Sequence, residues 1–110
     1  ENYSEAIKIL EKNLNLLKNI NTYEIYKKNF FDFFSSNKSL DLKFDIIFID
    51  PPYKEKKINE IIEIILEKKI LTQNGILIIH RHKKDDIKLT DKLRIIEDRT
   101  YGISKILFGN

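Results

Sequence analysis

The sequence predicts an α/β fold in which helices connect the strands of a parallel sheet. Two segments, Phe44–Ile49 and Ile76–Ile79, are almost continuously apolar, as strands buried on both faces of a parallel sheet are. Between them, apolar residues recur at intervals of three and four, which is typical of an amphipathic helix. A strand, a helix and a second strand in this order form the repeating unit of α/β proteins.

Composition and charge exclude several classes of protein. The 110 residues are 42% hydrophobic and 34% charged, with 3 glycines and 2 prolines, which excludes disordered and collagen-like chains. No apolar run approaches the ~18 residues that a membrane span needs. The absence of cysteine excludes disulfides and zinc–thiolate sites and fits a cytoplasmic protein. A net charge of +3 weakly indicates an acidic partner such as nucleic acid.

The elements before residue 44 are predicted from periodicity and turn chemistry. A helix is expected from Ser4 to about Asn19, because its apolar residues recur at helical spacing. Tyr23–Lys27 predicts a short strand, and the aromatic segment Asn29–Phe34 predicts a helical turn before a polar loop over Ser35–Asp41. The residues that form the apolar face of the first helix are Ala6, Ile7, Leu10, Leu14 and Leu17.

The elements after residue 44 follow the α/β pattern and end in a hairpin. The strand Phe44–Ile49 stops at two prolines, which cannot continue a strand, and Lys56–Lys69 predicts the crossover helix. We expect a turn at Asn74-Gly75, the strand Ile76–Ile79 and a charged loop over His80–Asp86. The last two strands, Leu93–Glu97 and Ile103–Phe108, are joined by a connection short enough to indicate an antiparallel pair.

The segment Asp50-Pro51-Pro52-Tyr53 is the motif that carries chemistry, because ligands bind beyond the carboxyl ends of strands in open α/β sheets. An exocyclic amine of a nucleobase is a poor nucleophile, since its lone pair is delocalised into the ring. The Asp50 carboxylate and the Pro51 carbonyl could accept hydrogen bonds from the two N–H groups of such an amine, and the proline rings fix the direction of that carbonyl. Tyr53 could stack on the base. A rigid turn whose aspartate caps the next helix is the alternative interpretation.

Phe44–Tyr53 resembles motif IV of S-adenosylmethionine-dependent amino-methyltransferases and, more narrowly, the RsmD family of 16S ribosomal RNA guanine-N2 methyltransferases. The resemblance covers essentially the whole chain and implies a class I Rossmann-like fold. It implies that Glu1 binds the ribose of the cofactor and that Asn29 lies near its adenine, which Phe30 could edge. Gly75–Ile79 is similar to the fifth strand of the family, and Arg99–Gly102 to its terminal hairpin.

The chain departs from the family pattern in two respects. The glycine-rich loop that holds the methionine part of the cofactor is absent, and so are the first two strands of the family's sheet. We therefore expect residues 1–110 to be the C-terminal part of one methyltransferase domain, which binds the cofactor weakly or not at all as it stands. The second departure is His80, where the family commonly has glutamate; a solvated histidine and a contact to base or phosphate are both open.

Two basic clusters lie on the predicted active-site edge and could contact RNA phosphates, although a solvated lysine-rich surface is the alternative. The four phenylalanines of Phe30–Phe34 are more typical of packing than of base stacking. His80 and His82 lack a carboxylate cluster beside them, so no metal site is expected. The candidate RNA-binding residues are Lys54, Lys56, Lys57, His80, Arg81, Lys83 and Lys84.

The resemblance implies transfer of a methyl group from S-adenosylmethionine to the N2 amine of a guanine in 16S ribosomal RNA. In this interpretation Asp50 and Pro51 hold the amine, Pro52 stiffens the turn and Tyr53 stacks on the base. The partner would be 16S ribosomal RNA or the small ribosomal subunit, and the enzyme a monomer. Two alternatives stay open: an N6-adenine methyltransferase that acts on DNA or RNA, which uses the same motif, and a non-catalytic RNA-binding fragment.

Overall fold

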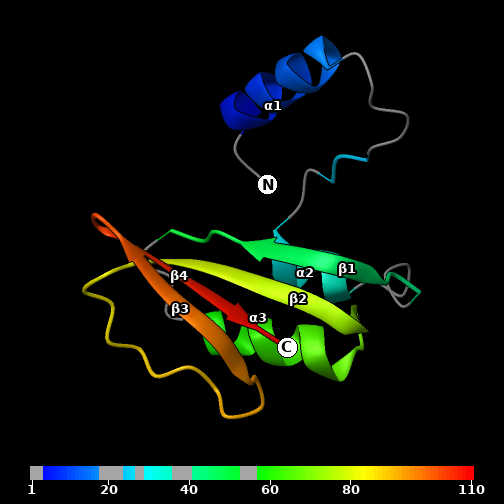
Figure 1. Cartoon of the computed structure of the whole chain (residues 1–110). Helices are drawn as coiled ribbons and strands as arrows, with labels where there is room; N and C mark the ends of the chain where they lie inside the picture. The colour runs from blue at the N-terminus through cyan, green and yellow to red at the C-terminus, as the bar shows by residue number, and fades with distance from the viewer. Residues whose placement is uncertain (1–3, 18–23, 27–28, 36–40, 53–56) are drawn as a thin grey trace. The chain divides into compact units, whose positions relative to one another are not determined.

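The computed structural model describes residues 4–17, 24–26, 29–35, 41–52 and 57–110. The chain divides into two units, residues 1–39 and 40–110, and the second of these contains the sheet (Figure 1). The expected α/β class is confirmed, since helices and a four-stranded sheet occur together. No helix in the described ranges is long and apolar enough to cross a membrane.

The first unit contains the helices α1 (Ser4–Leu16) and α2 (Phe30–Ser35). α1 confirms the expected first helix but ends three residues earlier than predicted, and Ile7 is its buried residue. The predicted strand at Tyr23–Lys27 is wrong over residues 24–26, which have no strand structure; Tyr23 and Lys27 lie outside the described residues. A strand needs a neighbour that accepts and donates its backbone hydrogen bonds, and apolar alternation alone does not supply one.

The aromatic residues of α2 pack against one another. The backbone N–H of Phe31 donates to Oδ1 of Asn29 at 2.9 Å, so Asn29 caps the helix. The ring of Phe30 lies 4.7 Å from that of Phe34, and the ring of Phe33 lies 4.7 Å from that of Tyr26, measured between centroids. These contacts support the packing interpretation of the phenylalanine cluster.

The second unit is a four-stranded sheet with one crossover helix. Its strands are β1 (Phe44–Ile49), β2 (Leu71–His82), β3 (Ile95–Tyr101) and β4 (Ser104–Gly109), in the order β1-β2-β4-β3. β1 and β2 are parallel, as the sequence predicts, and β4 is antiparallel to both β2 and β3. The expected terminal hairpin is thus confirmed, although its first strand starts at Ile95 rather than at Leu93.

The crossover helix α3 (Ile58–Glu67) covers one face of this sheet (Figure 1). It runs from the end of β1 to the start of β2, which is the connection that a parallel pair requires. Its apolar residues fall on one side at helical spacing and become buried, as the sequence predicts. The core of the unit comprises Ile49, Ile58, Ile61, Ile62, Ile65, Ile70, Leu77, Ile79, Leu93 and Leu107.

β2 is much longer than the predicted strand Ile76–Ile79, and two expectations are corrected by its length. Asn74-Gly75 is not a turn but lies within β2, where the pairing with β1 shifts register between Phe44 and Ile46. This irregularity in the strand pairing accommodates the bend that Asn-Gly favours without ending the strand. His80–His82 belongs to β2 rather than to a loop, because β4 pairs with these residues from the other side.

The face of the sheet that does not bear α3 carries exposed apolar side chains on β1. Phe44, Ile46 and Phe48 alternate with the partly buried Ile47 and the buried Ile49, because successive side chains of a strand point to opposite faces. Asp50 follows Ile49 directly. The same alternation therefore assigns Asp50 to the face of Phe48, opposite to α3.

Candidate active site

Asp50 and His80 lie side by side at one edge of the sheet. Ile49 of β1 pairs with Ile79 of β2, so the next residue of each parallel strand is brought to the same level. The expectation that His80 shares the sheet edge of Asp50 is confirmed. Both residues end apolar runs at the carboxyl ends of parallel strands, the position where α/β proteins bind ligands.

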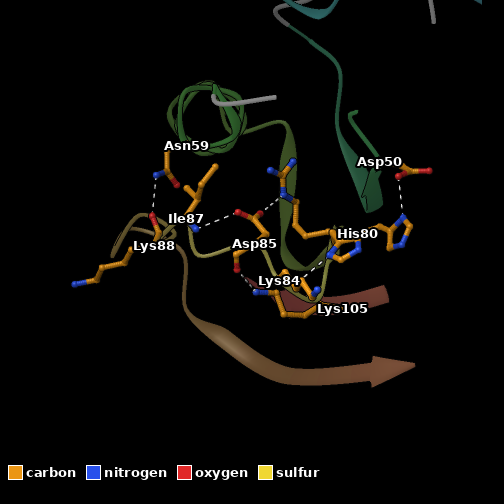
Figure 2. A network of polar contacts seen from close by, with 10 residues as sticks. Asp50, Asn59, His80, Lys84, Asp85, Ile87, Lys88 and Lys105 are labelled. Atoms are coloured by element: carbon orange, nitrogen blue, oxygen red, sulfur yellow. Dashed lines mark hydrogen bonds and ion pairs between the residues drawn. The ribbon is translucent and has the colours of Figure 1, made fainter. Parts of the chain in front are cut away.

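The imidazole of His80 is held by two partners. Its Nδ1 atom lies 2.9 Å from Oδ1 of Asp50, and its Nε2 atom lies 2.9 Å from Oγ of Ser104. Figure 2 shows the ring of His80 directed toward the Asp50 carboxylate. The interpretation of His80 as a solvated strand-end residue is therefore wrong, since both ring nitrogens are engaged within the protein.

These residues line a pocket of about 140 Å³ at the edge of the sheet. Ile103 and Ser104 enter it from the β3–β4 hairpin, and neither is predicted as a site residue from the sequence. The pairing of Ser104 with His82 brings them there, and no local pattern in the sequence signals that pairing. The residues around the pocket are Asp50, Pro51, His80, Arg81, His82, Ile103 and Ser104.

The structure describes part of the predicted amine-binding motif. The side chain of Asp50 is exposed by 55%, Pro51 is half-buried at the pocket and Pro52 is exposed. Asp50 is thus open to solvent while one of its oxygens is fixed by His80. Four other predicted site residues lie outside the described residues: Glu1, Tyr53, Lys54 and Lys56.

Arg81 is not an RNA-contact residue, contrary to the expectation from sequence. It is only 2% exposed, on the face of β2 covered by α3, and its guanidinium pairs with the carboxylate of Asp85. Asp85 also accepts the backbone N–H of Ile87, while its own carbonyl accepts from Nζ of Lys105 at 3.0 Å (Figure 2). Arg81 therefore anchors the segment that follows β2.

The predicted lysines in the described residues are exposed. Lys83 and Lys84 follow β2 next to the pocket, and Lys57 precedes α3. The backbone N–H of Lys83 donates to the carbonyl of Ile103 at 2.8 Å, and that of Lys84 donates to Nδ1 of His82 at 3.0 Å. The backbone of this basic segment is thereby tied to the pocket rim.

The described residues contain only part of the expected cofactor set. Asn29 and Phe30 offer an amide and an aromatic ring, which suit a purine, and the cap to Phe31 fixes the orientation of the Asn29 side chain. The sequence has no Gly-x-Gly segment for the methionine end of the cofactor. Within the described ranges, no three His, Asp or Glu side chains gather as a metal site would require.

The sequence matches the model of the family described as "Conserved hypothetical protein 95" over residues 1–110, its full length. The chain belongs to this family. The match confirms the resemblance to the RsmD-type methylases that the motif and the order of the elements indicate.

Two sequence relatives of this RsmD-type chain and one solved structure of similar fold carry methylase descriptions. An uncharacterized methylase of Rickettsia prowazekii is 34% identical over 64 residues, which cover 58% of this chain and 27% of that protein. Ribosomal RNA small subunit methyltransferase D of Buchnera aphidicola is 35% identical over 78 residues, which cover 71% of this chain and 39% of that protein. A candidate methylase of Haemophilus influenzae has a similar structure, with a TM-score of 0.77, 23% identity, and coverage of 100% of this chain and 69% of the other.

The fold of the RsmD-type chain is thus that of a partial Rossmann-like methyltransferase. The chain spans about a quarter to two fifths of the length of the two curated relatives, and about two thirds of the solved structure.

Proposed function

We propose that the protein transfers a methyl group from S-adenosylmethionine to the exocyclic N2 amine of a guanine in 16S ribosomal RNA. The observation that carries this proposal is the placement of Asp50. Its carboxylate stands at the carboxyl end of a parallel strand, on the rim of a pocket, with Oδ1 bonded to His80. Among the described residues, Oδ2 of Asp50 has no partner and is free to accept a hydrogen bond from a substrate.

The acceptors of the motif suit an amine that must be activated. Oδ2 of Asp50 accepts a hydrogen bond from one N–H group of the amine, and the carbonyl of Pro51 accepts a hydrogen bond from the other. Holding both hydrogens draws the nitrogen toward tetrahedral geometry, which directs its lone pair at the methyl group. Catalysis then consists mainly of positioning, with little acid–base work. The guanine must leave its stack to reach the pocket, as other bases that undergo chemistry do.

S-adenosylmethionine supplies the methyl group in this proposal. Of the chain's own residues, Asn29 and Phe30 would meet the adenine and Glu1 the ribose. The amide of Asn29 and the ring of Phe30 fit a purine. These 110 residues contain no glycine-rich segment that would match the methionine end of the cofactor.

Ribosomal RNA as the substrate is supported by the Buchnera relative, whose name describes a methyltransferase of small-subunit ribosomal RNA. The exposed Lys83 and Lys84 beside the pocket are consistent with a polyanionic substrate, since phosphate contacts position nucleic acid without reading its sequence. The choice of guanine N2 over adenine N6 rests on the resemblance to the RsmD family.

The test is a methylation assay with the protein produced from the whole reading frame. Under-methylated small ribosomal subunits are incubated with radiolabelled S-adenosylmethionine, and the RNA is digested to nucleosides. We expect label in N2-methylguanosine with the wild type and none with Asp50→Ala. Cofactor affinity, measured by calorimetry, should be nearly equal in both proteins, because Asp50 holds the amine.

The matched control is Asp98→Ala, which removes an exposed carboxylate from the edge strand β3 and should retain full activity. Label in N6-methyladenosine, or only on added DNA, would contradict the proposal in favour of an adenine methyltransferase. If the protein binds the cofactor but labels no nucleic acid, the proposal is contradicted and the protein is a non-catalytic binding protein.

A further inference from the structure

Three strands meet at His80. Asp50 follows β1, His80 lies near the end of β2, and Ser104 begins β4. The carboxylate, the imidazole and the hydroxyl form a continuous chain with two separations of 2.9 Å between bonded atoms. β2 lies between β1 and β4 in the sheet, so its strand-end side chain can reach both neighbours.

The sheet register fixes this chain of contacts. Asp50 and His80 extend the parallel pair Ile49–Ile79 by one residue. His80 faces Ile106 across the antiparallel ladder, and Ser104 is two residues away on the same face, which is the diagonal neighbour. The imidazole is therefore held from two sides by backbone that the sheet makes rigid. The side chain of His80 is 34% exposed, less than the 55% of Asp50.

The bonds define what each group does. An ionised carboxylate only accepts hydrogen bonds, so Nδ1 of His80 carries the hydrogen that is shared with Oδ1 of Asp50. In the neutral ring Nε2 is then an acceptor, and it takes the hydroxyl hydrogen of Ser104. Oδ1 of Asp50 is bonded to the imidazole, and Oδ2 has no partner among the described residues.

Without a bonded neighbour, an exposed aspartate next to a proline turn would sample several rotamers. In most of these rotamers the carboxylate cannot form the hydrogen bond to the substrate amine. A group that acts by holding a reacting atom must keep its geometry to within about half an ångström, which requires support from neighbouring side chains. His80 is the described residue that bonds to the Asp50 carboxylate.

We propose that His80 is a positioning residue that fixes the Asp50 carboxylate for the substrate amine, and that Ser104 fixes the imidazole in turn. This inference rests on the proposed methylation of an exocyclic amine. It assigns to His80 a role different from the contact with RNA that its neighbourhood of basic residues indicates.

Two nearly isosteric substitutions separate this role from general destabilisation. In His80→Asn the amide nitrogen takes the place of Nδ1 and can still donate to Asp50. In His80→Gln the amide nitrogen takes the place of Nε2, near Ser104, and the bond to Asp50 is lost. We expect His80→Gln and His80→Ala to lower kcat by ~100-fold, the size of effect that a misplaced reacting group produces. KM for RNA and cofactor should stay nearly constant.

His80→Asn should recover most of the lost kcat, and Ser104→Ala should lower kcat less than His80→Gln does. Thr100→Ala, which removes an exposed hydroxyl from β3, is the control for Ser104→Ala and should behave as wild type. Equal activity of His80→Asn and His80→Gln would overturn the proposal. A rise in KM for RNA at unchanged kcat would overturn it too and assign His80 to the RNA contact.

A spectroscopic measurement tests the contact independently of turnover. The ¹⁵N NMR shifts of the His80 ring in the wild-type protein should report a hydrogen on Nδ1, and Asp50→Ala should abolish this preference. A hydrogen on Nε2 in the wild type would overturn the proposed arrangement. Failure of the wild type to methylate RNA, with Nδ1 protonated as expected, would defeat the proposed function alone. Covalent labelling of Ser104 by a fluorophosphonate would make Ser104 a nucleophile and overturn its positioning role.

Discussion

The guanidinium of Arg81 lies on the face of the sheet that α3 covers and pairs with the carboxylate of Asp85, four residues along the chain. The side chain of Arg81 is 1% exposed and that of Asp85 11%, so both charges are largely removed from water. Lys105 of β4 bonds to the backbone carbonyl of the same aspartate. The pair thus attaches the segment after β2, which bears Lys83 and Lys84, to the core.

Removal of one partner should cost more stability than the pair itself contributes. Arg81→Met leaves the Asp85 carboxylate in a site built for a cation, and we expect it to lower the free energy of unfolding by about 3 kcal/mol. Arg94→Met, at an exposed arginine, should change it by less than ~0.5 kcal/mol. Urea unfolding followed by circular dichroism measures both, and equal losses in the two variants would refute a special role for the pair.

The same contact predicts a dependence of stability on acid. Burial by itself would raise the pKa of Asp85, but the hydrogen bonds from Arg81 and Ile87 and the charges of Arg81 and Lys105 outweigh it and hold this pKa below its ordinary value. A lowered pKa contributes stability above the unfolded value of about 3.9, and this stability is lost as pH falls through the folded value.

The wild type should therefore lose part of its free energy of unfolding below about pH 4, a part that Asp85→Asn lacks at every pH. Urea titrations at a series of pH values should show the gap between the two proteins closing on acidification. Asp86→Asn, at the exposed neighbour, should follow the wild-type profile. A gap that stays constant down to pH 2 would show that Asp85 is not the titrating group.

The core between α3 and the sheet predicts a large loss from a single truncation. Ile62 is fully buried, and Ile62→Ala removes three carbon atoms from a packed interior. The expected cost is ~2–5 kcal/mol, because the cavity adds to the lost transfer free energy. Ile96→Ala, at an exposed position of β3, should cost less than ~1 kcal/mol. Thermal melts of both variants measure these losses of stability. Similar losses in the two variants would contradict this placement of α3.

The parallel pair and its crossover helix could be predicted because their signals are local. Phe44–Ile49 is apolar at nearly every position, and Ile58, Ile61, Ile62 and Ile65 repeat at helical spacing, so burial and local geometry agree. The predicted strand at Tyr23–Lys27 was wrong over residues 24–26, since a strand exists only with a partner that no local pattern specifies.

Of the candidate site, only the residues at the ends of individual strands could be predicted, not the contacts between β2 and β4. Asp50 and His80 end two recognisable apolar runs, so their common edge follows from parallel pairing. Ser104 reaches the site through the antiparallel pairing of β4 with β2, which the sequence does not signal. Arg81 was misassigned for a related reason: alternation in β2 directs it to the face of Leu77 and Ile79, whereas a basic cluster counted along the sequence ignores the faces of a strand.

Lys83 and Lys84 are exposed directly after the pocket residue His82, and this placement predicts how binding of RNA depends on salt. Each lysine that contacts a phosphate releases a counterion, so Lys83→Ala with Lys84→Ala should reduce the slope of log K against log[salt] by roughly 2 and weaken binding of all sequences similarly. Lys92, which pairs with Glu63 and Glu67 on α3, offers a control, because Lys92→Ala should leave the slope unchanged. Fluorescence titrations of a 16S RNA fragment over a range of potassium chloride concentrations provide the slopes. An unchanged slope in the double variant would mean that both lysines are ordinary solvated residues, and the RNA would have to follow another path across the protein.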